Sequence, residues 1–169
     1  MITFHNGDLL KSGCDIICHQ VNEYGVMGAG IALQIKEQFP TVCDTYKRFV
    51  AEIGSKRLGL YGRVLFAEEN GVQVANCFSQ IRGETSGALV WYCAELVLKR
   101  AKSIVHRKGK ATVGIPDHYG SGIAKGDWED ILSTWTDIFK YEKNIELQVW
   151  KLQKVVDKHR LKCCNGCTR

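Results

Sequence analysis

The sequence predicts an α/β domain with a largely parallel or mixed sheet and helices on both of its faces. Short apolar segments typical of strands alternate along the chain with longer segments of helical periodicity, which is the order that builds such layers. The segment "ATVGIP" at 111–116 is almost entirely apolar, as expected for a strand that helices cover on both sides. A length of 169 residues is enough for one domain with its own core.

The predicted strands are short segments rich in β-branched and other apolar residues. The first two cover 2–6 and 15–21. The segments "RVLFAE" and "VQVANCF" predict two more strands, which pair across the turn residues "ENG". The strand at 111–116 follows, and "IELQVWKL" at 145–152 is the last.

The predicted helices lie between these strands. In the first, over 28–39, apolar residues recur at every fourth position. Pro40 ends this helix or starts the next one, over 41–53, and a long helical pattern covers 87–107. The last helix opens near Asp127, which is placed to cap its first turn.

We expect one domain over 1–152 and a basic, cysteine-rich tail over 153–169. Apolar residues make up 45% of the chain and charged residues 24%, which is typical of globular proteins. No apolar run approaches the ~20 residues of a membrane span, and the first residues lack the features of a signal peptide. We therefore expect a cytoplasmic protein with no membrane partner.

Charge is distributed unevenly along the chain. The formal net charge is +5, and the last nineteen residues, 151–169, hold six basic residues and one acidic residue. Basic and acidic residues are therefore equal in number over 1–150. Without an excess of positive charge, this part of the chain gives no sign of a nucleic-acid-binding face by charge alone.

The cysteines fall into two groups. Buried free thiols are expected for the five that lie in apolar segments, which are Cys14, Cys18, Cys43, Cys77 and Cys93. Cys163, Cys164 and Cys167 lie near His159 in the tail. Because adjacent cysteines do not repeat the paired C-x₂-C spacing of zinc sites, we expect no metal there and favour a flexible tail with reactive thiols.

Two glycine-rich loops have the same design. "GVMGAG" at 25–30 follows one predicted strand and opens a helix, and "YGSGIAKGDW" at 119–128 does the same later in the chain. In a parallel sheet both loops leave the carboxyl edge, where such sheets bind ligands. Backbone N–H groups at a helix N-terminus attract anions, so the pair predicts a ligand with two linked phosphates. The alternative is that the glycines only form tight turns.

The two loops match neither of the common nucleotide-binding patterns. Gly-Lys-Ser/Thr does not occur in the chain, which excludes a P-loop. Neither loop contains G-x-G-x-x-G, which disfavours a Rossmann dinucleotide site. Beside the loops, Asp8 and Asn22 stand at the ends of predicted strands. Asp8 is either an N-cap or a ligand contact, and Asn22 either forms a turn or hydrogen-bonds a sugar hydroxyl.

Four segments, in order and with the right spacing, resemble a macro domain: "GDLL", "DIICHQVNEYGVMGAGIALQIKEQFP", "VANCFSQ" and "IPDHYGSGIAKGDWEDI". The resemblance covers 2–152. It is strongest to the branch of terminal ADP-ribose protein glycohydrolase, its relatives that reverse DNA ADP-ribosylation, and the ADP-ribose 1″-phosphate phosphatases. It implies a three-layer α/β/α sandwich with a mixed, mostly parallel central sheet that binds ADP-ribose, with no cofactor.

The resemblance also assigns site residues. It implies that Asp8 binds the adenine amino group, that Leu9 makes a backbone contact nearby and that Asn22 faces the distal ribose. The residues implied to hold that ribose and the diphosphate are Gly28, Ala29, Gly30, Ile31, Gly120, Ser121, Gly122, Ile123 and Ala124.

The sequence departs from this branch at two positions. Its glycohydrolases use a lysine where this chain has Gln80 and an acid near Ala124. An amide cannot form a Schiff base, so a lysine-linked mechanism is not expected. Asn22 and His118 remain as candidate catalytic residues, although a plain position in a surface loop is the favoured interpretation of His118, and Asp117 has the same status. The polar segment 81–87 is either a mobile loop over the distal ribose or a plain connection.

We expect a monomer that hydrolyses ADP-ribose 1″-phosphate or a related distal-ribose derivative, with little or no release of ADP-ribose from glutamate or DNA. A non-catalytic reader of ADP-ribose is the main alternative. A nucleic-acid-associated accessory protein that acts through the basic tail is a weaker one.

Overall fold

The structure is a computed structural model and describes residues 1–152. The predicted tail, with its expected domain boundary and its cysteines, lies outside the described residues. Along the described chain the strands and helices are β1 (Ile2–Asn6), β2 (Ile16–Gln20), α1 (Gly30–Gln38), α2 (Pro40–Ile53), β3 (Val64–Glu69), β4 (Val72–Cys77), β5 (Gln80–Ile81), β6 (Glu84–Thr85), α3 (Gly87–Lys108), β7 (Ala111–Pro116), α4 (Trp128–Phe139) and β8 (Ile145–Lys151), with 3₁₀ turns η1 (Leu9–Lys11) and η2 (Arg57–Leu60).

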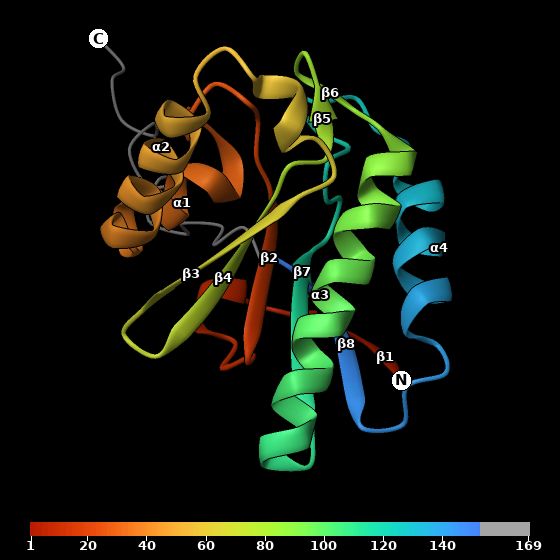
Figure 1. The fold of residues 1–169 in the computed structure, drawn as a ribbon. Coiled ribbons are helices and arrows are strands. Elements are labelled where there is room, and N and C mark those ends of the chain that lie inside the picture. The colour runs from red at the N-terminus through yellow and green to blue at the C-terminus, as the bar shows by residue number, and fades with distance from the viewer. Residues whose placement is uncertain (153–169) are drawn as a thin grey trace, which may run out of the picture.

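Within residues 1–152, six strands form one sheet in the order β1-β8-β7-β2-β4-β3. All neighbours pair in parallel except β3, which runs antiparallel to β4 at the edge. The helices α1 and α2 cover one face, and α3 and α4 cover the other (Figure 1). The predicted α/β sandwich with a mixed, mostly parallel sheet is therefore confirmed.

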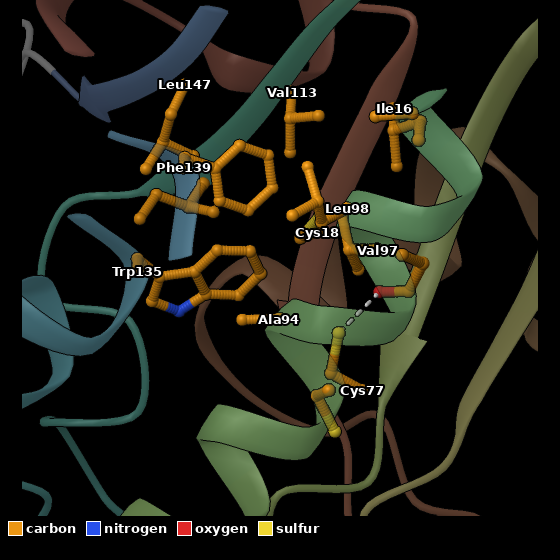
Figure 2. Packing of buried hydrophobic residues seen from close by; sticks show 14 of the residues in the cluster. Ile16, Cys18, Cys77, Ala94, Val97, Leu98, Val113, Trp135, Phe139 and Leu147 are labelled. Atoms are coloured by element: carbon orange, nitrogen blue, oxygen red, sulfur yellow. Dashed lines mark hydrogen bonds between the residues drawn. The ribbon is translucent and has the colours of Figure 1, made fainter. Parts of the chain in front are cut away.

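The face under α3 and α4 is packed with large apolar side chains. Trp135 and Phe139 of α4 lie beside Ala94 and Val97 of α3, and together they cover the sheet (Figure 2). Trp135 and Phe139 are fully buried, and burying the Phe139 side chain alone contributes about 1.5–3 kcal/mol. This packing holds β7 and its neighbours in place beneath the helices.

The opposite face is buried under α1 and α2. Because side chains alternate along a strand, Ile16 of β2 packs toward α3 and α4, whereas Ile17 packs toward α1 and α2. The second core also holds Ile35 of α1 and Tyr46 of α2, both fully buried. The five cysteines predicted to be buried free thiols, Cys14, Cys18, Cys43, Cys77 and Cys93, are buried and free.

A buried polar pair lies between β2 and β4 on this face. Asn76 Nδ2 donates to the Leu65 carbonyl at 3.0 Å, so Asn76 Oδ1 is the acceptor that faces His19 Nε2 at 2.8 Å. His19 Nε2 therefore carries the proton. Burial lowers the pKa of His19, and the neutral ring fills the core.

Two turns at opposite ends of the sheet follow from local chemistry. Asp127 caps α4, with its Oδ1 accepting from the Asp130 N–H at 3.1 Å, as predicted. The turn between β3 and β4 has Asn70 and Gly71 at φ of +54° and +76°, the left-handed pair that tight hairpins require.

None of the helices in 1–152 is long and apolar enough to cross a membrane.

Candidate ligand-binding site

A cavity of about 840 Å³ lies at the carboxyl edge of the sheet. It opens where β2 and β7 are neighbours but continue into helices on opposite faces, which is where open α/β sheets form crevices. The predicted site residues that line it are Asp8, Leu9, Asn22, Gly28, Ala29, Gly30, Ile31, His118, Gly120, Gly122, Ile123 and Ala124. The structure thus brings together both glycine loops and both polar strand ends.

Ser121 is the predicted residue that does not line the cavity. Its hydroxyl donates to the His118 carbonyl at 3.0 Å and so stabilises the loop from within. Ile123 lies at the rim of the cavity and is 82% exposed. A large apolar side chain in that position has little to cover it in the free protein.

The N-terminus of α1 opens directly into the cavity. Its N-cap, Ala29, offers no side-chain hydrogen bond, so the first N–H groups of the helix stay free for a ligand. Gly30 has φ of +56°, a conformation that glycine adopts without strain. The partial positive charge of a helix N-terminus favours an anion here.

The second loop would hold an anion differently, because Asp127 already caps α4. The Ser121 N–H donates to the His118 carbonyl at 3.1 Å, so the backbone donors that remain available beside the cavity are those of Gly120 and of residues 122–124. No lysine or arginine is among the cavity-lining residues of the described chain. An anion in this cavity would therefore be bound by backbone N–H groups and the helix dipole rather than by side-chain cations.

Both interpretations of Asp8 agree with the structure. Its Oδ1 accepts from the Leu10 N–H at 3.0 Å and caps η1. Its Oδ2 lies 3.5 Å from Lys11 Nζ, and the residue lines the cavity. One carboxylate oxygen stabilises the turn, and the other is available to accept a hydrogen bond from a ligand.

Asn22 forms the turn that begins the first glycine loop. Its Oδ1 accepts from the Tyr24 N–H at 2.9 Å, and its Nδ2 donates to the Val26 carbonyl at 2.7 Å. The Tyr46 hydroxyl lies 3.0 Å from Asn22 Oδ1. One Nδ2 hydrogen has no protein acceptor among residues 1–152, so the amide keeps a single donor for a ligand.

His118 and Asp117 form a pair beside the second loop. His118 Nδ1 lies 3.0 Å from Asp117 Oδ2, and the imidazole ring stacks on Trp128 with centroids 5.5 Å apart. Both Asp117 and His118 line the cavity. The carboxylate fixes the ring through Nδ1, which leaves Nε2 free for proton transfer.

The segment 81–87, predicted to be a mobile loop over the distal ribose or a plain connection, contains the turn and the second strand of a short hairpin. β5 and β6 pair antiparallel, and Arg82 and Gly83 form the turn with φ of +51° and +86°. The hairpin lies at the same end of the molecule as the glycine loops (Figure 1). Gln80 and Gly83 bring it into the cavity wall.

Glu23 holds the tip of this hairpin. It is 3% exposed, and its Oε1 accepts from the Arg82 N–H at 3.0 Å and from the Tyr61 hydroxyl at 3.2 Å. Burial, together with the carboxylate, raises the pKa of Tyr61 and keeps it a donor. Glu23 was not singled out in the sequence, because nothing local marks a glutamate in a turn as buried.

The lining residues missed in the sequence include Gln20, Tyr24, Tyr119, Trp150 and Leu152. The one feature of the sequence that could have found them is their position at or shortly after the carboxyl ends of predicted strands. Trp150 is held from two sides: its Nε1 donates to Gln148 Oε1 at 3.0 Å, and its ring stacks on His5 with centroids 4.7 Å apart.

Strand order places these groups in a row. In the strand order from β1 to β4, the lining groups are Asp8 after β1, Trp150 of β8 and the second loop after β7. The first loop with Asn22 follows β2, and Gln80 comes after β4. Four strand spacings of ~4.8 Å give a length of roughly 19 Å. The row suits an elongated ligand with its anionic part in the middle.

No protein-family model matches the chain. A DNA ADP-ribosyl glycohydrolase of Mycobacterium tuberculosis is 27% identical over 152 residues, which cover 89% of this chain and 42% of that protein. The chain thus spans less than half the length of that relative.

Solved structures with the same architecture include the macrodomain of Mycobacterium tuberculosis DarG, with a TM-score of 0.74, 24% identity, and coverage of 89% of this chain and 97% of that one. Thermosipho africanus DarTG in complex with ADP-ribose gives a TM-score of 0.67 and 18% identity over 86% of this chain and 40% of that one. The chain therefore has the macrodomain fold.

Proposed function

We propose that the cavity binds ADP-ribose and that the protein hydrolyses ADP-ribose 1″-phosphate or a related derivative substituted on the distal ribose. The row of groups along the sheet edge is the observation that carries the proposal. Asp8 at one end offers a carboxylate oxygen to an adenine amino group, and two sets of backbone N–H groups in the middle suit a diphosphate.

The other end of the row suits the distal ribose. Asn22 has one amide hydrogen available to a ligand there, and Gln80 lines the cavity next to it. The solved Thermosipho africanus relative is in complex with ADP-ribose, which supports the same ligand for this fold. With the ligand placed in this direction, the anomeric substituent lies near Asn22 and Gln80.

Hydrolysis here relies on positioning rather than on a strong nucleophile. No lysine lines the described cavity, so no amine is available for a Schiff base at the anomeric carbon. An anomeric phosphate needs an oriented water and a proton for the leaving oxygen, and ordering these groups supplies much of the rate. His118, with Nε2 free, is the proposed proton donor.

The Mycobacterium relative acts on DNA, according to its name. For this chain we propose weak or no release of ADP-ribose from DNA or from glutamate, because the lining offers no amine. A non-catalytic reader is the second candidate. It is favoured by the Asn22 amide, most of whose hydrogen-bonding capacity is taken up within its own turn.

One set of assays separates these candidates. Calorimetry with ADP-ribose, AMP and a single-stranded oligonucleotide tests which ligand the full chain binds, and ADP-ribose is expected to bind most tightly. Phosphate release from ADP-ribose 1″-phosphate is then measured beside ADP-ribosyl-glutamate and ADP-ribosyl-DNA. Turnover of the 1″-phosphate alone supports the proposal. Binding without turnover supports the reader, and efficient cleavage of DNA or glutamate adducts contradicts the proposed substrate.

A further inference from the structure

A chain of hydrogen bonds joins the second glycine loop to Gln80. The Gly120 carbonyl can only accept, so the Thr85 hydroxyl donates to it over 2.6 Å. A hydroxyl has one hydrogen, and Thr85 Oγ1 must therefore accept from Gln20 Nε2 at 3.0 Å. The Ser79 carbonyl, 3.3 Å from the same nitrogen, fixes the Gln20 amide in the same orientation.

The orientation of Gln20 decides that of Gln80. With Nε2 of Gln20 turned toward Ser79 and Thr85, its Oε1 accepts from Gln80 Nε2 at 2.7 Å. Gln80 Oε1 then has no protein donor among residues 1–152, and the side chain lines the cavity. Groups from β2, from the β5–β6 hairpin and from the second glycine loop thus present one carbonyl oxygen to the cavity at its β4 end.

We propose that Gln80 is a catalytic residue whose Oε1 orients the water that attacks the substrate, and that Gln20 and Thr85 are positioning residues that hold its amide. This inference rests on the proposed function. An amide oxygen with a fixed direction accepts a hydrogen from water and directs the water lone pair toward the reacting atom, as glutamines do in phosphoryl transfer.

In the proposed step the water oxygen forms a bond to the phosphorus of the 1″-phosphate. The bond between phosphorus and the anomeric oxygen breaks, and its electron pair stays on that oxygen. One water proton ends on the released ADP-ribose hydroxyl and the other stays on inorganic phosphate. Gln80 takes no proton, so its contribution is to the geometry of attack.

The test compares Gln80→Met with wild type in phosphate release from ADP-ribose 1″-phosphate and in calorimetry with ADP-ribose. Methionine keeps the length of the side chain and removes the amide. We expect kcat to fall roughly 10- to 100-fold while ADP-ribose affinity is unchanged. Gln38→Met, at the exposed end of α1 outside the cavity, is the matched control and should retain wild-type kcat.

Thr85 tests the positioning chain. Thr85→Ser keeps the hydroxyl and should retain most of kcat, whereas Thr85→Val keeps the shape, loses the bond to Gly120 and should lower kcat. A structure of the wild-type complex with ADP-ribose provides a readout that does not depend on folding of the variants. It should show a water within about 3.2 Å of Gln80 Oε1, beyond the anomeric hydroxyl on the side that the 1″-phosphate would occupy.

The outcomes separate this inference from the proposed function. Wild-type turnover that survives Gln80→Met overturns the role of Gln80 and leaves the hydrolase intact. Absence of wild-type turnover, with ADP-ribose bound, overturns the hydrolase and the role of Gln80 with it. A complex without water at Gln80 Oε1 also overturns the role of Gln80.

Discussion

The Tyr46 hydroxyl lies 2.7 Å from the backbone carbonyl oxygen of Asn22 and 3.0 Å from its side-chain Oδ1. Tyr46 comes from α2, and burial raises its pKa, so it stays a neutral donor. The contact anchors the turn that starts the first glycine loop. It also explains why an asparagine in this position can orient a ligand without being mobile itself.

Asn22 and Tyr46 give separable effects. Asn22→Ala removes the proposed contact to the distal ribose, so it should lower kcat more than ADP-ribose affinity. Tyr46→Phe removes only the hydrogen bond that anchors the turn and should lower stability by about 0.5–1.5 kcal/mol, because the Asn22 carbonyl loses this donor while Asn22 Oδ1 keeps the Tyr24 N–H. Kinetics and thermal unfolding of both variants test this. Intact turnover in Asn22→Ala would favour the reader.

Asp8 has two roles that one substitution separates. Asp8→Asn keeps an oxygen for the η1 cap, since Asn and Asp cap about equally well, but it removes the charged acceptor. Losing a charge-assisted hydrogen bond to adenine should cost about 1.5–3 kcal/mol, or roughly 10- to 100-fold in affinity. Calorimetry with ADP-ribose measures this, and unchanged affinity would mean that Asp8 serves only as the cap.

Two glycines of the second loop should respond differently. A Cβ at Gly122 meets no atom within 4 Å, so Gly122→Glu should fold normally and exclude the diphosphate by bulk and charge. A Cβ at Gly120 would lie 3.0 Å from both Gln20 Nε2 and Thr85 Oγ1, at φ of +67°. Gly120→Ala should therefore cost about 1–3 kcal/mol of stability.

Thermal unfolding and ADP-ribose titration of the two glycine variants check this contrast. A folded Gly122→Glu protein that still binds with wild-type affinity would show that the diphosphate lies elsewhere.

The buried imidazole of His19 predicts a pH dependence of stability. Burial lowers its pKa below the ordinary value of 6.5, so below that pH the unfolded chain binds a proton that the folded chain does not. The free energy of unfolding should fall as the pH drops below about 6.5 toward the folded pKa, and His19 should have no effect above that range.

Urea unfolding between about pH 7 and pH 5 measures this slope. His19→Gln should flatten it, while His106→Gln, at an exposed position on α3, should leave it unchanged. Equal slopes in wild type and His19→Gln would assign the pH dependence to other groups.

Local patterns in the sequence predicted most of the fold and much of the cavity. The strands, the four main helices and the cap at Asp127 follow from periodicity and capping chemistry. Because loops that follow parallel strands all leave the carboxyl edge of the sheet, the sequence alone also predicts that Asp8, Asn22 and both glycine loops lie together.

Features that depend on distant partners could not be predicted. The strands β5 and β6 have two residues each, too few for a periodic pattern, and depend on Glu23 and Thr85 to hold them. Gln20 looks like any polar residue at a strand end. Its function in the network depends on Thr85, 65 positions away.

The most direct test of the account is a ¹⁵N-NMR titration of the full chain with ADP-ribose, with AMP as the comparison. We predict that ADP-ribose shifts the backbone amides of 28–32 and 120–124, the signals around Asp8, and the Gln80 side-chain amide. AMP should shift the signals around Asp8 and leave Gln80 unchanged. Absence of ADP-ribose shifts at the two loops, or shifts confined to another surface, would contradict the claim that this cavity binds ADP-ribose.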